Sequence, residues 1–291
     1  METENNMKRV ACVILNYNDS GTTVKLLNLI QNYTVFEMIV VVDNNSTDNS
    51  LEVLKEYETD KVAVIRSQKN GGYGYGNNCG IRYAEERGFD YALVANPDVV
   101  FKEKDIVDCL DIISANDDVA AIAPRIKNGI AFKIAPPMLD ITYSSLLLNK
   151  IFKPRYYPSS YYDNDSGMVY VDALPGSLVL FDIRKFSEVG MYDENVFLYN
   201  EELIIGKKFL DRGYKTVLNL NDEYLHMHGV SVNKTFRGSL KPNRIARQSQ
   251  KYYLKEYLKA NKAVLVMMDV LWPIQVVELF VWRKLKPLFD R

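Results

Sequence analysis

The sequence predicts an α/β protein with a doubly wound, mostly parallel sheet and a helical tail at its C-terminal end. Short apolar runs of strand length alternate with amphipathic stretches of helical period from residue 10 to residue 124. Polar side chains follow each of the first four runs, where strands of such a sheet would end. Beyond residue 232 the chain becomes basic and helical, so we expect a sheet domain over residues 1–232 and a tail over 233–291.

The expected strands and helices follow one another in regular order. Five apolar runs are predicted to be strands, at residues 10–15, 38–42, 62–65, 91–95 and 119–124. Amphipathic helices are expected between them, and Ser46 is expected to cap the second helix. The alternation stops at residues 128–167. Strands are predicted again at 168–172 and 177–181, and a further helix from Glu201 to about Arg212.

The polar residues that follow the first four apolar runs are predicted to lie together. They are Asn16 and Tyr17, Asp43 and Asn45, residues 70–78, and Asn96 and Asp98. Because parallel strands end on the same edge of a sheet, these side chains would meet in one crevice, where ligands of such sheets bind. Ordinary loop polarity would give a similar set with less regularity.

Asp98 closes the segment that follows the fourth apolar run, directly after a proline. A carboxylate at a strand end can hold a divalent cation against a diphosphate, as rim aspartates commonly do in nucleotide chemistry. A turn or helix cap is the alternative, since Asn96-Pro97-Asp98 also suits a turn. The polar residues at the neighbouring strand ends favour the ligand interpretation.

A glycine-rich segment, residues 70–80, follows the third strand and opens a helix. Gly72, Gly74 and Gly76 lack the G-x-G-x-x-G spacing and no GK[ST] occurs, so a Rossmann dinucleotide site and a P-loop are poorly supported. Glycines here would let the backbone approach a sugar or a diphosphate, with helix N–H groups facing it. A flexible loop is the alternative.

Residues 128–167 form a long stretch without a regular pattern, and it is rich in tyrosine. A segment of this length in a compact domain is usually a lid or a recognition loop. Tyr156, Tyr157, Tyr161 and Tyr162 suit stacking against sugar rings, and they suit packing inside the protein equally well.

Two pairs of titratable residues are candidates for the chemistry. Glu201 and Glu202 are adjacent at the expected start of a helix, where an inward carboxylate can act as a general base, or both can stabilise the helix dipole. His226 and His228, the two histidines of the chain, would lie on one face of a strand. Either could bind a metal or a diphosphate beside Asp98, with a buried structural histidine as the alternative.

The composition limits the setting of the protein. Net charge is −1, which by itself points to no polyanionic partner. Three cysteines without C-x-x-C spacing argue against a disulfide framework or a zinc knuckle and favour a reducing cytosol. The polar N-terminal residues do not have the pattern of a secretory signal.

The tail concentrates positive charge, since residues 234–262 carry nine Lys or Arg and one acid, or +8 against −9 for the remainder. Seven of these basic residues recur at steps of three or four, which predicts one basic side of a single helix. They are Lys241, Arg244, Arg247, Lys251, Lys255, Lys259 and Lys262. Nucleic acid binding is not expected, because no recognised module accompanies the charge.

An apolar segment, residues 263–282, follows and is interrupted by Asp269, Pro273, Gln275 and Glu278. A membrane-spanning helix needs about 20 apolar residues without such interruptions. We therefore expect a peripheral anchor on an anionic cytoplasmic leaflet. A helical cap on the sheet domain or a contact in a homo-oligomer is the alternative.

These segments together resemble the family-two nucleotide-sugar glycosyltransferases of the GT-A fold, in their rhamnosyltransferase-like subgroup. The resemblance covers about residues 10–231. The matching segments are LNYN at 15–18, VDNNSTD at 42–48, the N-x-G-x-x-x-G-x-N-x-G spacing of 70–80, Asn96-Pro97-Asp98 in place of the family's DxD element, residues 190–194 and 197–202 for its GxFDE and FLYxED stretch, and 226–231 for its closing histidine motif.

The resemblance implies an inverting transfer of a sugar from a nucleoside diphosphate donor. Asp98 would bind Mg²⁺ or Mn²⁺ across the diphosphate, helped by His226 or His228, and Glu202 or Glu201 would take the proton of the acceptor hydroxyl. Asp43 would recognise the nucleobase or the ribose. The donor-binding residues would be Asn16, Tyr17, Asp43, Asn45, Asn70, Gly72, Gly76, Asn78, Asn96 and Asp98.

Three positions depart from the family's pattern. Glu202 stands where the family more often has Asp, Ile204 stands where many members have another Asp, and Asn96 leaves Asp98 as the single carboxylate for the metal. The resemblance implies a UDP- or dTDP-linked donor and a saccharide or polyprenyl-linked acceptor in cell-surface polysaccharide assembly, at the cytoplasmic face of the membrane. A catalytically inactive nucleotide-sugar binding or scaffold protein on the same fold is the alternative.

Overall fold

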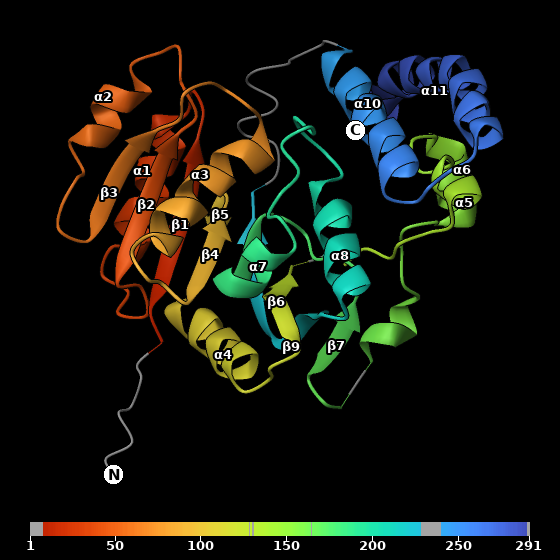
Figure 1. The fold of residues 1–291 in the computed structure, drawn as a ribbon. Coiled ribbons are helices and arrows are strands. Elements are labelled where there is room, and N and C mark those ends of the chain that lie inside the picture. The colour runs from red at the N-terminus through yellow and green to blue at the C-terminus, as the bar shows by residue number, and fades with distance from the viewer. Residues whose placement is uncertain (1–7, 128, 130, 164, 228–239, 290–291) are drawn as a thin grey trace.

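A β-sheet lies at the centre of the protein (Figure 1). The structure is a computed structural model that describes residues 8–127, 129, 131–163, 165–227 and 240–289. In these residues nine strands form one sheet in the order β3-β2-β1-β4-β8-β6-β9-β5, and β7 pairs with β9. The strands are β1 (Val10–Asn16), β2 (Met38–Asp43), β3 (Val62–Arg66), β4 (Tyr91–Ala95), β5 (Val99–Val100), β6 (Val119–Ile126), β7 (Met168–Val171), β8 (Leu178–Asp182) and β9 (Lys215–His226). The predicted mostly parallel sheet is confirmed.

The direction of the strands decides which loops meet. The first four strands are all parallel, with β1 between β2 and β4 and with β3 on the outside of β2. Their polar C-terminal loops therefore lie at one edge of the sheet, as the sequence predicted. β8 then runs antiparallel to β4 and β6, and β5 runs antiparallel to β9. This last pairing sets Val99 opposite His226 and so brings the turn after β4 next to the end of β9.

Helices cover both faces of the sheet, because the apolar side chains of its inner strands point alternately to each face. One core joins the sheet to α1 (Ser20–Ile30), α2 (Ser50–Lys55) and α4 (Glu103–Ser114). The other core joins it to α3 (Tyr73–Glu85), α7 (Ile183–Glu188) and α8 (Glu201–Arg212). The doubly wound architecture predicted from the alternating sequence pattern is thus present.

The stretch expected to lack regular structure contains short helices. They are α5 (Pro137–Asp140), α6 (Leu146–Phe152) and a 3₁₀ turn, η1 (Ser159–Tyr162). Ser145 caps α6 by accepting a hydrogen bond from the Leu148 N–H, at 3.1 Å. Tyr157 and Tyr161 stack on each other with ring centroids 4.4 Å apart, and Tyr161 keeps 36% of its surface exposed. Each helix has fewer than eight residues, which is too short to give a clear helical period in the sequence.

The tail is two helices, α10 (Lys241–Glu256) and α11 (Lys262–Phe289), and the single basic helix expected from the sequence is wrong. The chain turns between them, where Lys259 has a φ of +52°. Lys259 and Lys262 therefore do not continue the basic side of α10. Figure 1 shows α5, α6, α10 and α11 gathered at one side of the molecule, away from β3.

The apolar segment of the tail is also more regular than predicted, since α11 continues through Pro273. Over the part of the chain that the structure describes, one helix, Lys262–Trp282, has the length and apolar composition needed to cross a membrane. Of its most apolar window, 17% is buried inside the protein.

The conformation at the start of α3 gives a test of the fold. Gly72 has a φ of +93°, and a Cβ there would lie 2.0 Å from the Phe197 carbonyl oxygen. We expect Gly72→Ala to lower the free energy of unfolding by about 2–4 kcal/mol, because it combines backbone strain with a clash. Gly21→Ala in α1 is the matched control, since nothing lies within 4 Å of its Cβ position. It should stabilise by about 0.5–1 kcal/mol. Urea unfolding of both variants measures the difference, and equal effects would contradict the packing described.

Candidate active site

Asp98 and His226 lie side by side at one edge of the sheet. Asp98 sits in the turn between β4 and β5, and the pairing of β5 with β9 carries His226 to it. The His226 Nε2 atom is 3.1 Å from the Asp98 Oδ1 atom, and the Met227 N–H donates to the Asp98 carbonyl at 2.9 Å. The predicted neighbourhood of these two side chains is therefore confirmed. His228, the other predicted ligand, lies outside the described residues.

Asn16 and Asp43 join the ends of β1 and β2 through a buried network. The Asn16 amide donates to the Asp43 carboxylate at 3.1 Å, and the Ser46 N–H donates to the same carboxylate at 3.0 Å. Both Asn16 and Asp43 have no exposed surface, so the predicted contact of Asp43 with a nucleobase is not available in this conformation. Ser46 closes this loop and does not cap α2, whose N-cap residue is Asn49. The network shapes the crevice from within.

The glycines at the start of α3 allow close packing inside the protein. A Cβ on Gly76 would lie 2.3 Å from a methyl carbon of Leu15, and the Tyr73 N–H that follows Gly72 donates to the Phe197 carbonyl at 2.9 Å. The predicted close approach of backbone is present, but the approaching groups belong to the protein. Gly72 and Gly76 thus hold α3 against the sheet and the segment before α8, and their approach to a donor stays a prediction.

Asn78 connects α3 to the segment that leads to α8. Its amide donates to the Tyr192 carbonyl at 2.9 Å and to the Glu194 carboxylate at 3.0 Å, and its oxygen accepts from the Tyr192 N–H at 3.1 Å. The side chain has no exposed surface in this conformation. Asn78 therefore fixes the chain at Tyr192 and Glu194, shortly before Glu202, and its contact with a donor stays a prediction.

Four of the predicted donor-side residues are partly exposed. These are Tyr17, Asn45, Asn70 and Asn96, which follow β1, β2, β3 and β4 respectively. Asn45 has a φ of +56°, and the Asn70 side-chain oxygen accepts hydrogen bonds from the Asn44 amide and the Gly72 N–H, at 3.1 and 3.2 Å. These four residues are the accessible members of the strand-end set, and Asn16 and Asp43 are its buried members.

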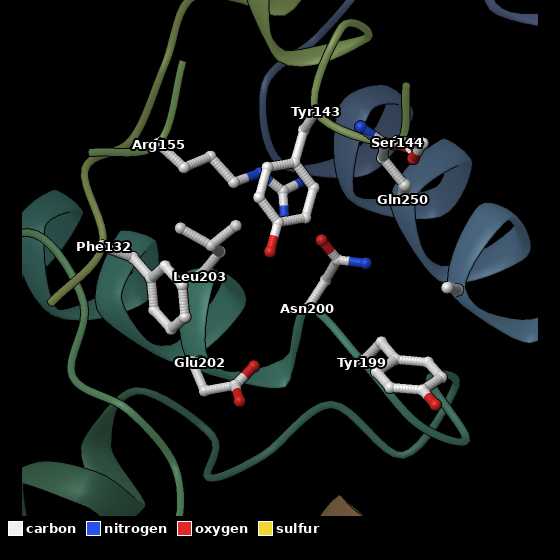
Figure 2. A pocket seen from close by; sticks show the side chains of 10 residues that line it. Phe132, Tyr143, Ser144, Arg155, Tyr199, Asn200, Glu202, Leu203 and Gln250 are labelled. Carbon is white, nitrogen blue, oxygen red and sulfur yellow. Dashed lines mark hydrogen bonds between the residues drawn. The ribbon is translucent and has the colours of Figure 1, made fainter. Parts of the chain in front are cut away.

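Glu202 lines a cavity of about 230 Å³ between α8, α10 and the segment 132–155. The cavity is lined by Phe132, Tyr143, Ser144, Arg155, Tyr199, Asn200, Glu202, Leu203, Ala246 and Gln250. Figure 2 shows the Glu202 carboxylate, the Asn200 amide and the Tyr143 hydroxyl around the same hollow. Glu201 is not among the lining residues, although both glutamates occupy the first turn of α8. The structure therefore separates two adjacent acids that the sequence could not distinguish.

Burial changes the acidity of both glutamates. It raises the pKa of Glu202, against the lowering effects of a hydrogen bond from its own N–H and of the positive charge of Arg155. Burial and the neighbouring charge of Glu202 together raise the pKa of Glu201 to about 8. The Glu201 Oε2 atom has no hydrogen-bond partner in the described part of the chain. A raised pKa in a cavity is a property of general bases and acids.

Residues that the sequence did not single out form the far wall of this cavity. Arg155 makes a two-pronged ion pair with Asp140, at 2.8 and 2.9 Å, and its guanidinium lies 3.9 Å from the Tyr143 ring centroid. The Gln250 amide of α10 donates to the Asp140 carbonyl at 2.8 Å. Asn200, which has a φ of +67°, directs a side-chain oxygen without a partner among the described residues into the cavity. Only the position of Asn200, directly before the two glutamates, was a signal in the sequence.

The metal-ligand set is incomplete within the described residues. No group of three or more His, Cys, Asp or Glu side chains there could hold a metal ion. Asp98 and His226 supply two potential ligands. A diphosphate and water would have to complete the coordination of any cation at this position.

Comparison with solved structures identifies the class of fold, which is that of the GT-A glycosyltransferases. GalNAc-T7, solved with UDP, GalNAc and Mn²⁺, matches 85% of this chain and 48% of its own with a TM-score of 0.64 and 16% identity. The mannosyltransferase PcManGT from Pyrobaculum calidifontis, solved with GDP-Man and Mn²⁺, matches 95% of this chain and 75% of its own with a TM-score of 0.58 and 13% identity.

The sequence places the chain within that class. Residues 11–174 match the family described as glycosyl transferase family 2, and the chain belongs to this family. The predicted resemblance is therefore confirmed, and the matched region contains the strand-end residues from Asn16 to Asp98.

Three curated relatives are similar to the chain. The low-salt glycan biosynthesis hexosyltransferase Agl10 of Haloferax volcanii is 29% identical over 67% of this chain, which spans 59% of that protein's length. A UDP-N-acetylglucosamine–dolichyl-phosphate N-acetylglucosaminyltransferase of Methanococcus voltae is 27% identical over 79% of the chain and 93% of its own length. An N-acetylglucosaminyl-diphospho-decaprenol L-rhamnosyltransferase of Mycobacterium tuberculosis is 25% identical over 67% and 68%.

The raised pKa of Glu201 gives a stability test. Its pKa rises from 4.5 to about 8 on folding, so between these values the folded state holds a proton that the unfolded chain has lost. Stability from this group therefore falls as the pH rises through that window. We expect Glu201→Gln to match the wild type near pH 4 and to melt roughly 5–10 °C higher near pH 8. Thermal unfolding followed by circular dichroism at both pH values measures this.

The exposed Glu56→Gln is the matched control for this experiment, and its melting temperature should follow the wild type at both pH values. A constant difference between Glu201→Gln and the wild type across the pH range would contradict the raised pKa.

Proposed function

We propose that the chain is an inverting glycosyltransferase that moves a sugar from a UDP- or dTDP-linked donor to a lipid-linked or saccharide acceptor. The observation that carries the proposal is the Glu202 carboxylate lining a cavity of about 230 Å³. The names of two relatives, which contain dolichyl phosphate and diphospho-decaprenol, support a polyprenyl-linked acceptor. Agl10, named for glycan biosynthesis, supports a role in surface polysaccharide assembly.

Glu202 would act as the general base. Because burial raises its pKa, it holds a proton more tightly than an exposed glutamate does. It would remove the proton from the acceptor hydroxyl as that oxygen attacks the anomeric carbon of the donor sugar. The bond from this carbon to the phosphate oxygen breaks on the opposite side, its electron pair leaves with the nucleoside diphosphate, and the anomeric configuration inverts.

Asp98 and His226 fit a divalent cation, since a carboxylate oxygen is a hard ligand and an imidazole lies 3.1 Å from it. Solved neighbours that contain Mn²⁺ support Mg²⁺ or Mn²⁺ here. Such a cation, when bound, would offset the negative charge of the departing diphosphate. Asp98 would hold it at the end of β4 and His226 would approach it from β9, with His228 as a further candidate.

Asn200 would contact the acceptor. Its side chain is 6% exposed, and its oxygen has no hydrogen-bond partner among the described residues. An unpaired buried amide oxygen costs about 1–3 kcal/mol, which a hydroxyl group of a bound acceptor would recover. Because Asn200 and Glu202 line one cavity, such a contact would orient a neighbouring hydroxyl toward the base.

The rim residues Tyr17, Asn45, Asn70 and Asn96 would contact the donor, because they are the partly exposed members of the predicted set. Asn16, Asp43 and Asn78 would hold the loops in place. We further propose that residues 1–232 carry the transferase chemistry, that residues 233–291 form a tail, and that the protein works at the cytoplasmic face of a membrane.

The assignment of the base is tested by two conservative variants. Glu202→Gln should lower kcat by about 10²–10⁴-fold, because it keeps the shape of the side chain and removes its ability to take a proton. Glu201→Gln is the matched control and should keep most of the activity, since Glu201 does not line the cavity. Release of nucleoside diphosphate from UDP- and dTDP-sugars with an acceptor measures turnover. Full activity in Glu202→Gln would refute this role, and donor binding without turnover in the wild type would favour a scaffold protein.

The cation site is tested through binding as well as turnover. A donor that binds together with Mn²⁺ should raise the melting temperature of the wild type by mass action. In Asp98→Ala the part of that rise that depends on Mn²⁺ should disappear, and kcat should fall at least about 10²-fold. Asp60→Ala, at an exposed position on the surface, is the control and should keep both. An unchanged Mn²⁺ response in Asp98→Ala would show that the cation binds elsewhere.

A further inference from the structure

The outer side of α11 is an apolar stripe. Val266, Val270, Ile274, Val277 and Val281 recur at steps of three and four, and between 50% and 65% of each side chain is exposed. This spacing sets them along one line of the helix. Apolar side chains that are scattered over a surface need no explanation, whereas a continuous line over the length of a helix does.

The polar residues of α11 do not interrupt this stripe. Asp269 is ion-paired with Arg247 and with Lys251 of α10, the latter at 2.8 Å. Gln275 is buried against the protein, with 7% exposed. Their side chains therefore take part in docking the helix onto the rest of the chain.

Glu278 does the same at the other end of the helix. It accepts hydrogen bonds from the Ser145 hydroxyl and the Leu146 N–H, at 2.9 Å. The side of α11 opposite the stripe is closed by the buried side chains of Val264 and Met268. The interruptions that argued against a membrane helix in the sequence thus lie beside the stripe and not within it, and Asp269, which stays 47% exposed, is held by its ion pairs to α10.

α6 extends the apolar surface next to α11. It packs against α11, and Lys150 of α6 lies over the Trp282 ring, 5.5 Å from its centroid. Four of its side chains are exposed and apolar, namely Leu146, Leu147, Ile151 and Phe152. Among the described residues, 12 of the 22 exposed large apolar side chains lie on α6 and α11, which pack against each other. We name this surface the α6–α11 face.

Exposed basic side chains border the α6–α11 face. Lys262 begins α11 and Lys284 lies near its end, while Lys150 and Lys153 lie on and after α6. An apolar surface between basic side chains is complementary to a leaflet with anionic headgroups, because the apolar groups enter the acyl boundary and the cations meet the phosphates. A second copy of the chain would instead bring these like charges together.

We propose that the α6–α11 face docks on one leaflet of an anionic membrane, with α11 lying in the plane of the interface. α11 cannot cross the bilayer while it packs against α10. In that arrangement Asp269, Gln275 and the paired Arg247 and Lys251 would lie in hydrocarbon. The protein would be held as a monotopic membrane protein by two helices of its own fold.

The position of this surface relates to the cavity. Ser144 lines the cavity one residue before Ser145 caps α6, and Gln250 lines it from α10, which packs against α11. If the acceptor is lipid-linked, which rests on the proposed function, its head group could reach Glu202 while its chain stays in the leaflet. Docking itself does not depend on that assignment.

The test is co-flotation of the full-length protein with vesicles of phosphatidylcholine alone and with phosphatidylglycerol added. The wild type should float with the anionic vesicles. The triple variant Val270→Ser, Ile274→Ser and Val277→Ser should bind them about tenfold or more weakly, because it removes the centre of the stripe. Lys150→Gln with Lys153→Gln should weaken binding only to the anionic vesicles, and added salt should mimic that loss.

A matched control separates docking from general stickiness. Leu29→Ser with Leu210→Ser removes two exposed leucines from α1 and α8, far from this surface in the sequence, and should float like the wild type. Circular dichroism melts show that each variant is folded, and donor binding by thermal shift tests the proposed function separately. The proposal fails if the wild type does not float, if the triple variant floats equally well, or if the wild type is a dimer that the triple variant converts to a monomer.

Discussion

A buried ion pair between Asp140 and Arg155 holds together the part of the molecule that the sequence described least well. The two side chains are 0% and 5% exposed and make two hydrogen bonds, at 2.8 and 2.9 Å. Removing one partner of such a pair leaves a buried charge and costs about 3–5 kcal/mol. Because Gln250 of α10 donates to the Asp140 carbonyl and carboxylate, the same pair also ties the segment 131–163 to the tail. The cavity lies where the segment 131–163, α8 and α10 meet.

The same ion pair influences the acidity of the cavity. Arg155 carries a positive charge close enough to Glu202 to lower its pKa, against the effect of burial. Asp140 carries the opposite charge, and its carboxylate is turned toward Arg155 and Gln250. A lone arginine would stabilise the ionised glutamate strongly and make it a weaker base, whereas the paired arginine leaves the effect of burial dominant. The pair that fixes the cavity thus also keeps Glu202 basic.

The sequence predicted what depends on local pattern. Apolar periodicity located the strands and most helices, and strand direction then placed Asp98, Asn96 and Asn45 at one edge of the sheet. The partners of Asn78 could not be predicted, because they lie 114 residues away at Tyr192. The exposure of the strand-end side chains could not be predicted either. A polar residue after a strand can face a ligand or, like Asp43, accept hydrogen bonds from a neighbouring loop. The turn near Lys259 was missed because basic spacing persists on both sides of it.

One departure from the family pattern has its explanation in the tail. Ile204 stands where the resemblance led us to expect an acid, and in this structure it is fully buried in a cluster with Leu203, Val196 and Tyr253 of α10. An aspartate there would lose its hydration without a cationic partner in that cluster. An apolar residue at position 204 therefore suits the packing of α10 over α8. The tail is then part of the wall around Glu202, so a change that loosens α10 from α8 would also change the cavity.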